Sequence, residues 1–275
     1  MIRRIDGRAA SELMDEAIAS SAGATAQWRR WRALAKIRSG KPGPMLLEGV
    51  RVDGSAFSIT VIRNLQAGEL EPSDRPPSIT ELKPGVAYVD LTRADAAAYR
   101  AALPKLAQAE AVIFDVRGYP RVPRGLLNAM SDRTIKSAKM EVPLVTRPDH
   151  AFDWIDEGWT IPAQGSRLSG KLIFMTDGRA ISYAESILGV VEGERLGPIV
   201  GEPTAGTNGD VNPLPLPGGY TLTYTGLRVT KQDGSRHHGI GIVPTHPVSR
   251  TVAGFRSGQD EQLEVALSLA GGATP

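Results

Sequence analysis

The sequence predicts a mixed α/β fold, with a mainly parallel sheet in its larger, C-terminal part. Short apolar runs, among them AVIFDV at 111–116 and KLIFMT at 171–176, have the length and composition of buried strands. Stretches typical of helices lie between such runs, near 124–131 and at 182–194. Strands that alternate with helices in this way usually pair in parallel, so the order predicts a parallel α/β core.

The other elements of this part follow the same alternation. GVAYVDL at 85–91 predicts a strand, and residues 93–109 predict a helix capped by Thr92, with Asp95 three residues later. GYTLTYTGLRVT at 219–230 alternates with the period of a strand. Further strands are expected in VPLVT (142–146) and GPIVGEP (197–203), and a closing helix in DEQLEVALSLA (260–270).

The first 64 residues are organised differently. IRRIDGR at 2–8 predicts an edge strand and a turn at Asp6-Gly7, with no partner strand before it. Apolar residues at helical spacing predict two helices, at 9–20 and 25–38. GVRVDGSAFSITVIR at 49–63 predicts a hairpin that turns at Asp-Gly.

A polar stretch separates the two parts of the chain. Residues 65–84 contain four prolines and read as a linker. The predicted organisation is therefore a small module at 1–64, a linker at 65–84 and a core domain at 85–275.

The composition excludes several classes of function. The 275 residues include 32 basic and 30 acidic side chains, a net charge of +2 that gives no footprint for nucleic acid. Cysteine is absent, which excludes disulfides, thiolate catalysis and cysteine-based zinc sites. No apolar stretch approaches the roughly 20 residues of a membrane-spanning helix. We find no adenine-binding or phosphate-binding signature and expect no cofactor and no metal.

Ser182 lies in a sequence context that is compatible with a catalytic serine. In TDGRAISYAES, a predicted strand ends at a tight turn, and Ser182 then opens a predicted helix. A serine in this place either caps the helix or acts as a nucleophile, since the N–H of Tyr183 could stabilise an oxyanion. The G-x-S-x-G motif of the α/β-hydrolases is absent, so this segment alone leaves both readings open.

Three segments together resemble the C-terminal processing, or tail-specific, serine peptidases, which are relatives of the tricorn core protease. Ser182 matches the serine of that family's T-A-S-A-A-E motif, and Glu185 holds the acidic place three residues later. Gly118 in VIFDVRGYP matches the glycine of D-x-R-G-N-x-G-G. GIVPT at 241–245 matches G-I-x-P-D.

The resemblance implies a fold and a location. It implies a crotonase/ClpP-like spiral core at 85–275, preceded by a partial PDZ-like module at 1–64. The first half of such a module and the helical region upstream of it have no counterpart here, so we expect a truncated or reduced family member, or a fragment. A periplasmic or other extracytoplasmic location is implied by the family, although MIRRIDGRAA lacks the apolar core of a signal peptide.

The resemblance also implies roles for individual residues. Ser182 would be the nucleophile, and the N–H groups of Gly118 and Tyr183 would form the oxyanion hole. Gly206 and Thr207 would contact the substrate.

The general base is the point at which the chain departs from the family. Thr207 occupies the place of the catalytic lysine, and threonine cannot accept a proton near neutral pH. His150, His237, His238 and His246 are the remaining candidates within the chain. We favour His238, which lies three residues before Gly241, with Glu185 holding the base or a water; His150 is expected at the surface.

Three functions remain open at this stage. The first is a serine peptidase that hydrolyses unstructured peptides or protein tails. The second is a non-catalytic or inactive relative that binds a peptide or an apolar ligand, as the retinoid-binding modules of the eye do. The third is another crotonase-like enzyme that stabilises an acyl oxyanion. The expected partner is a peptide or unfolded protein, and the resemblance allows a homo-oligomer.

Overall fold

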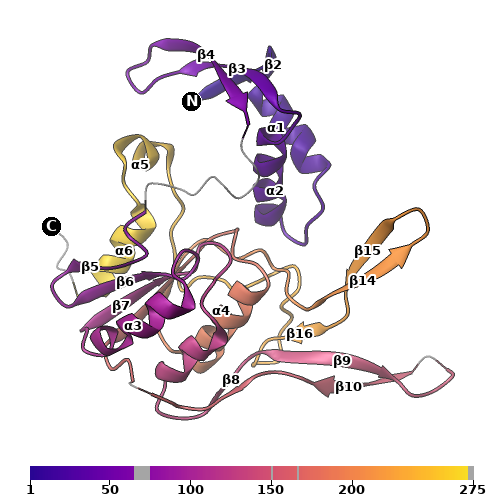
Figure 1. Cartoon of the computed structure of the whole chain (residues 1–275), viewed down its shortest axis with the longest axis vertical. Helices are drawn as coiled ribbons and strands as arrows, with labels where there is room; N and C mark the ends of the chain where they lie inside the picture. Colours follow the sequence, from indigo (N-terminus) through magenta and orange to yellow (C-terminus); the bar gives the residue numbers. More distant parts are fainter. Residues whose placement is uncertain (65–74, 150, 166, 272–275) are drawn as a thin grey trace. The chain divides into compact units, whose positions relative to one another are not determined.

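The computed structural model describes residues 1–64, 75–149, 151–165 and 167–271 (Figure 1). The chain divides into two compact units. Unit 1 contains Met1–Arg75 and Val252–Gln259, and unit 2 contains Pro76–Thr251 and Asp260–Pro275.

Unit 1 is a four-stranded antiparallel sheet with three helices. The strands have the order β2-β1-β3-β4. Its elements are β1 (Ile2–Ile5), β2 (Arg8–Ala9), α1 (Ala10–Ala19), α2 (Ala26–Arg38), β3 (Gly43–Val50), β4 (Ala56–Arg63) and α5 (Val252–Ser257).

The prediction that the first strand lies at a sheet edge is wrong. β1 pairs with β2 on one side and with β3 on the other, so both of its backbone edges are used. The turn at Asp6 and Gly7, where φ is 49° and 80°, reverses the chain at once and makes β2 the edge strand. The hairpin of β3 and β4 turns at Gly54 as predicted, with φ at 87°.

Unit 2 contains a six-stranded sheet, which confirms the mixed α/β prediction. The strand order is β17-β13-β12-β7-β6-β5, and every neighbouring pair is parallel except β5 with β6. The strands are β5 (Ile79–Lys83), β6 (Val86–Asp90), β7 (Ala111–Asp115), β12 (Lys171–Thr176), β13 (Ile199–Gly201) and β17 (His246–Pro247).

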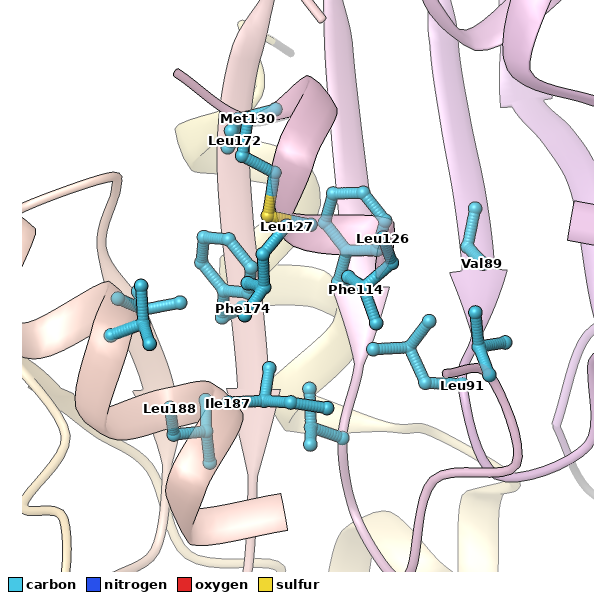
Figure 2. Close-up of a cluster of buried hydrophobic side chains, with 14 of the residues drawn as sticks. Val89, Leu91, Phe114, Leu126, Leu127, Met130, Leu172, Phe174, Ile187 and Leu188 are labelled. Carbon is cyan, nitrogen blue, oxygen red and sulfur yellow. The ribbon is translucent and has the colours of Figure 1, made fainter. Parts of the chain in front are cut away.

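Helices cover the two faces of this sheet. They are α3 (Ala96–Leu106), the 3₁₀ helix η1 (Arg124–Ala129), α4 (Tyr183–Glu194) and α6 (Glu261–Leu269). Alternate strand residues point to opposite faces, so Phe114 and Phe174 pack with α3, η1 and α4, and Ile113 and Ile173 pack with α6. Figure 2 shows the first of these clusters, in which the Phe114 and Phe174 rings stack 5.4 Å apart.

The predicted cap of the helix at 93–109 is also wrong. α3 begins at Ala96, and the Asp95 carboxylate caps it by accepting the N–H of Ala98 at 2.7 Å. Thr92 bonds instead to Asp90, through both its N–H and its hydroxyl. The Asp95 carboxylate caps the helix in place of the Thr92 hydroxyl because a charged carboxylate is a stronger hydrogen-bond acceptor than a hydroxyl.

Two long hairpins extend from this core (Figure 1). One is formed by β9 and β10, with β16 on the other side of β9, and the second by β14 and β15. The predicted strand at 219–230 is divided between them, since β15 and β16 belong to different sheets. The short strands β8 and β11 pair with each other. The strands of unit 2 outside the six-stranded sheet are β8 (Ile135–Lys136), β9 (Lys139–Val145), β10 (Phe152–Asp156), β11 (Thr160–Ile161), β14 (Val211–Leu216), β15 (Tyr220–Thr225) and β16 (Arg228–Thr230). Across the described residues, no helix has the length and apolar character needed to cross a membrane.

A buried arginine ties the end of β7 to the start of α6. Arg117 is 3% exposed, and its guanidinium contacts the Asp115 carboxylate at 2.6 Å and the Asp260 carboxylate at 2.8 Å. Burial alone would lower the pKa of Arg117, but the two carboxylates outweigh it and raise the pKa, so the group stays charged. The residue that precedes Gly118 is therefore fixed to the sheet.

We expect Arg117→Met to lower the free energy of unfolding by about 3–5 kcal/mol, because it leaves the fully buried Asp115 carboxylate without its counter-ion. Urea unfolding followed by circular dichroism measures this loss. The matched control is Arg167→Met, which removes a half-exposed pair with Asp132 and should cost less than about 1 kcal/mol. Equal losses in the two variants would contradict the assignment.

Candidate active site

Ser182 lies between β12 and α4 in a backbone conformation that L-amino acids rarely adopt. Its φ is 55° and its ψ is −110°. Ordinary capping residues of this chain are extended instead, as Thr25 is before α2 and Asp95 before α3. A strained residue of this kind costs roughly 1–3 kcal/mol and persists only where its surroundings fix it. The conformation is typical of a nucleophile on a sharp strand-to-helix turn.

Backbone hydrogen bonds hold this turn. The Asp177 carboxylate accepts the N–H of Arg179 at 2.9 Å, and the Asp177 carbonyl accepts the N–H of Ala180 at 3.0 Å. Ala180 in turn accepts the N–H of Ala205 at 2.9 Å, and the N–H of Ser182 donates to the Thr207 carbonyl at 3.0 Å. The loop at 204–207 therefore runs alongside the serine and fixes its position.

Glu185 is the centre of this arrangement. Its side chain is 1% exposed and accepts four hydrogen bonds. One oxygen takes the hydroxyl of Thr204 at 2.5 Å and the N–H of Gly206 at 2.7 Å. The other takes the N–H of Thr207 at 3.0 Å and that of Ser182 at 3.2 Å. A single carboxylate thus joins the first turn of α4 to the loop that matches the family's lysine segment.

The GIVPT segment closes around the same carboxylate. Ile242 donates its N–H to the Thr204 hydroxyl at 2.8 Å. Gly241 has φ at 77°, and a Cβ there would lie 2.3 Å from Thr204 Oγ1 and 3.1 Å from Glu185 Oε1. Only glycine allows so close an approach at this backbone angle.

The histidines fall in different places. His237 is 2% exposed, and its Nε2 lies 3.4 Å from Glu185 Oε1. His238 is exposed and lines a neighbouring hollow of about 710 Å³ that also contains Thr207. His246 belongs to β17 and contacts the Thr245 hydroxyl, and His150 lies outside the described residues.

The two expected oxyanion donors lie on segments that touch. The rings of Tyr119 and Tyr183 are 6.1 Å apart, and the Tyr183 hydroxyl donates to the Val122 carbonyl at 2.9 Å. Burial, with a smaller contribution from Tyr119, raises the pKa of Tyr183 to about 12, so this hydroxyl keeps its proton. These contacts place the loop after Gly118 beside the first turn of α4.

The two N–H groups differ in their bonding. Within the described part of the chain, the N–H of Tyr183 has no acceptor, as expected at the first position of a helix. The N–H of Gly118 donates to the Val116 carbonyl at 2.9 Å, with φ at 138°. Tyr183 is thus ready to donate, whereas Gly118 would have to leave Val116 to do so.

A hollow of about 440 Å³ opens beside Ser182. Aromatic and apolar side chains share its walls with polar ones, which include two carboxylates. Among the described residues that line it, none is a histidine, a lysine or an arginine. Its lining includes Tyr119, Trp159, Tyr183, Leu227, Glu157 and Asp210.

The comparison with protein families identifies the relationship. The model of peptidase family S41 matches residues 85–248. The chain belongs to peptidase family S41. This result confirms the resemblance to the C-terminal processing serine peptidases, which rests on the sequence around Ser182, around Gly118 and in the GIVPT segment.

Several solved structures have a similar fold at low identity. A mutant of CPAF has a TM-score of 0.74 and 13% identity, over 100% of this chain and 78% of that one. The photosystem II D1 C-terminal processing protease has a TM-score of 0.53 and 16% identity, over 100% and 68% of the two chains. A putative peptidase from Parabacteroides merdae has a TM-score of 0.59 and 16% identity, over 70% of this chain and 64% of that one. The chain thus spans just under two thirds of the Parabacteroides protein, and no curated protein matches it.

Ser182, Glu185, Gly206 and Thr207, which the motifs predict for the site, are joined by hydrogen bonds in the structure. The motifs do not predict the roles of Thr204 and the buried His237. Adjacent residues of a turn point in different directions, so the pattern His-His-Gly could not separate His237 from His238. The small residues that follow Thr204 are the one sequence feature that indicates its position, because small residues allow the backbone of this loop to pack closely against its neighbours.

We expect Glu185→Gln to lower the free energy of unfolding by about 2–3 kcal/mol, because an amide cannot accept from donors on both of its ends. Hydrogen exchange should accelerate at 182–186 and 204–207, and a thermal melt should show the loss. Glu192→Gln is the control: Glu192 meets Lys231 at 2.9 Å near the surface of the same helix, and the change should cost less than about 1 kcal/mol. Exchange that stays slow at 204–207 in Glu185→Gln would refute the role of this carboxylate.

Proposed function

We propose that this chain is a serine-type peptidase that hydrolyses unstructured peptides or protein tails, with Ser182 as the nucleophile. The strained Ser182 backbone, held by Glu185 and Thr207 at the mouth of a hollow, is the observation that carries the proposal. Membership of family S41 supports it. A serine that only capped α4 would need no such strain.

The proposed reaction is an acyl transfer in two steps. Ser182 Oγ attacks the peptide carbonyl while a base takes its proton, and the N–H groups of Tyr183 and Gly118 stabilise the oxyanion. The C–N bond then breaks, and the proton passes to the leaving amine. Water hydrolyses the acyl-serine in the second step and restores the hydroxyl.

His238 remains the proposed base within the chain. It lines the neighbouring hollow together with Thr207, whose carbonyl holds the N–H of Ser182. Its exposed side chain is free to turn when a peptide enters. Glu185 is better suited to positioning than to proton transfer, since both of its oxygens already accept hydrogen bonds.

One observation favours the second candidate, a member of the family that binds peptides without cutting them. Among the described residues, no histidine or lysine lines the hollow that holds Ser182. A chain without a base at this place would bind peptide and leave it intact.

We also propose the finer architecture that the family implies. A crotonase/ClpP-like spiral core at 85–275 is supported by the parallel strands of unit 2, and a partial PDZ-like module at 1–64 by the sheet and helices of unit 1. An extracytoplasmic location and a homo-oligomer rest on the family resemblance alone.

A fluorophosphonate probe separates the two candidates. We expect it to label wild type at Ser182, located by mass spectrometry of the digested protein, because an activated serine attacks phosphorus at neutral pH. Ser182→Ala should not be labelled, whereas Ser186→Ala, one turn later on α4, should be. Absence of labelling in all three proteins would favour the binding protein.

We expect His238→Ala to reduce peptide hydrolysis by roughly 10²–10⁴-fold, the usual effect of removing a positioned base. Rates on a fluorogenic peptide, corrected for the Ser182→Ala background, measure it. His246→Ala on β17 should keep nearly full activity. Activity that survives in His238→Ala would place the base elsewhere.

A further inference from the structure

We propose that the hollow beside Ser182 binds the side chain of a lysine or arginine of the peptide substrate. The proposal deepens the proposed function and rests on Ser182 being the residue at which the peptide is cut. Three properties of the hollow support it: its aromatic walls, its two unpaired carboxylates and the separation of charge between it and its neighbour.

The walls suit the long apolar stem of a basic side chain. Tyr183 joins two other rings into a continuous aromatic group, with its centroid 6.1 Å from that of Tyr119 and 6.0 Å from that of Trp159. Tyr119 is 56% exposed, so much of its surface is available to a ligand. Methylene stems of lysine and arginine pack well on such surfaces, and their cationic heads are attracted to aromatic faces. The Arg124 guanidinium lies 5.6 Å from the centre of the Trp159 ring, so a cation of the protein itself already contacts this ring, and Tyr119 is the more accessible wall.

Two exposed acidic residues line the same hollow, and neither has a cation of its own within the described residues. Glu157 and Asp210 line it, and neither side chain has an ion pair or hydrogen bond within the described residues. Their backbones are fixed, because the Glu157 N–H donates to the Met140 carbonyl at 2.9 Å and the Asp210 carbonyl accepts the N–H of Gly226 at 3.4 Å. The backbones of both residues are thus fixed at the wall of the hollow, and their carboxylates have no partner within the described residues.

The neighbouring hollow carries the opposite charge. It is lined by Lys139, Arg236 and His238, and it shares Asn208 and Leu227 with the hollow at Ser182. Its one arginine–carboxylate pair is internal: Arg228 and Thr230 lower the pKa of Glu141 to about 2, so Glu141 and Arg228 neutralise each other. A substrate cation is therefore drawn to the hollow at Ser182 and repelled from its neighbour.

A neutral aromatic or aliphatic side chain would fill the same walls but would leave both carboxylates without a partner. The hollow distinguishes a cation from a neutral side chain of the same shape because only the cation meets the two charges. Citrulline provides this comparison, since it has the shape of arginine without its charge.

The test measures binding to the full chain carrying Ser182→Ala, so that no cleavage is needed. Two fluorescent, unstructured peptides of glycine, serine and alanine are compared by anisotropy, one with a single arginine and the other with citrulline in its place. We expect the arginine peptide to bind about 10-fold more tightly at low salt, and the ratio to fall as salt screens the carboxylates. Glu157→Gln and Asp210→Asn should each lower the ratio about 3-fold, and the double variant should bring it close to one.

Asp132→Asn is the control, since it removes an exposed carboxylate outside the hollow and should leave the ratio unchanged. Unaltered binding of the citrulline peptide shows that each variant is folded. Equal binding of the two peptides, or an arginine preference that survives in the double variant, would overturn the proposal. An arginine preference in Ser182→Ala, together with a wild type that no fluorophosphonate labels, would support this hollow and refute the peptidase. Labelled Ser182 without the preference would refute the hollow alone.

Discussion

The buried carboxylate of Glu185 is the interaction on which the candidate site depends. It gathers four donors from the first turn of α4 and from the loop at 204–207, and it meets His237 from a third segment. A buried charge is costly unless it is fully hydrogen-bonded, so the three segments are constrained to meet at this point. The strained backbone of Ser182 persists because this network holds it from both sides.

The sheet supplies the rigid frame for that network. β7 and β12 run parallel and in register. β7 ends at Asp115, which binds Arg117, and β12 is followed directly by Asp177, which binds Arg179. The segments that carry Gly118 and Ser182 leave the same end of the sheet, as ligand-binding loops of parallel α/β sheets do. The candidate site thus lies where strand ends and a helix start converge.

The candidate active site has several of the groups that a serine peptidase needs, but it lacks an evident proton acceptor within the part of the chain that the structure describes. Ser182 in its strained conformation, an N–H at Tyr183 with no acceptor among the described residues, and the adjoining hollow are all present. The proton acceptor for Ser182 is the part that the site does not clearly supply. The resemblance puts Thr207 at the place of the family's catalytic lysine, and both oxygens of Glu185 already accept hydrogen bonds. The charges that do line the hollow, Glu157 and Asp210, are suited to recognition of a cation rather than to activation of Ser182.

The sequence by itself determined the α/β class, the alternation of elements and the place of Ser182 at a helix start, because hydrophobic periodicity and turn residues are local properties. Motif spacing was enough to give the family. Tertiary structure alone decided which groups meet: β1 gained two partners, Asp95 displaced Thr92 as a cap, and His237 rather than His238 turned inward. Glu157 and Asp210 lie 53 positions apart and line the same hollow only in the folded chain, in which β9 pairs with β16. Such contacts depend on long-range packing and on the direction of single side chains, and no local pattern encodes them.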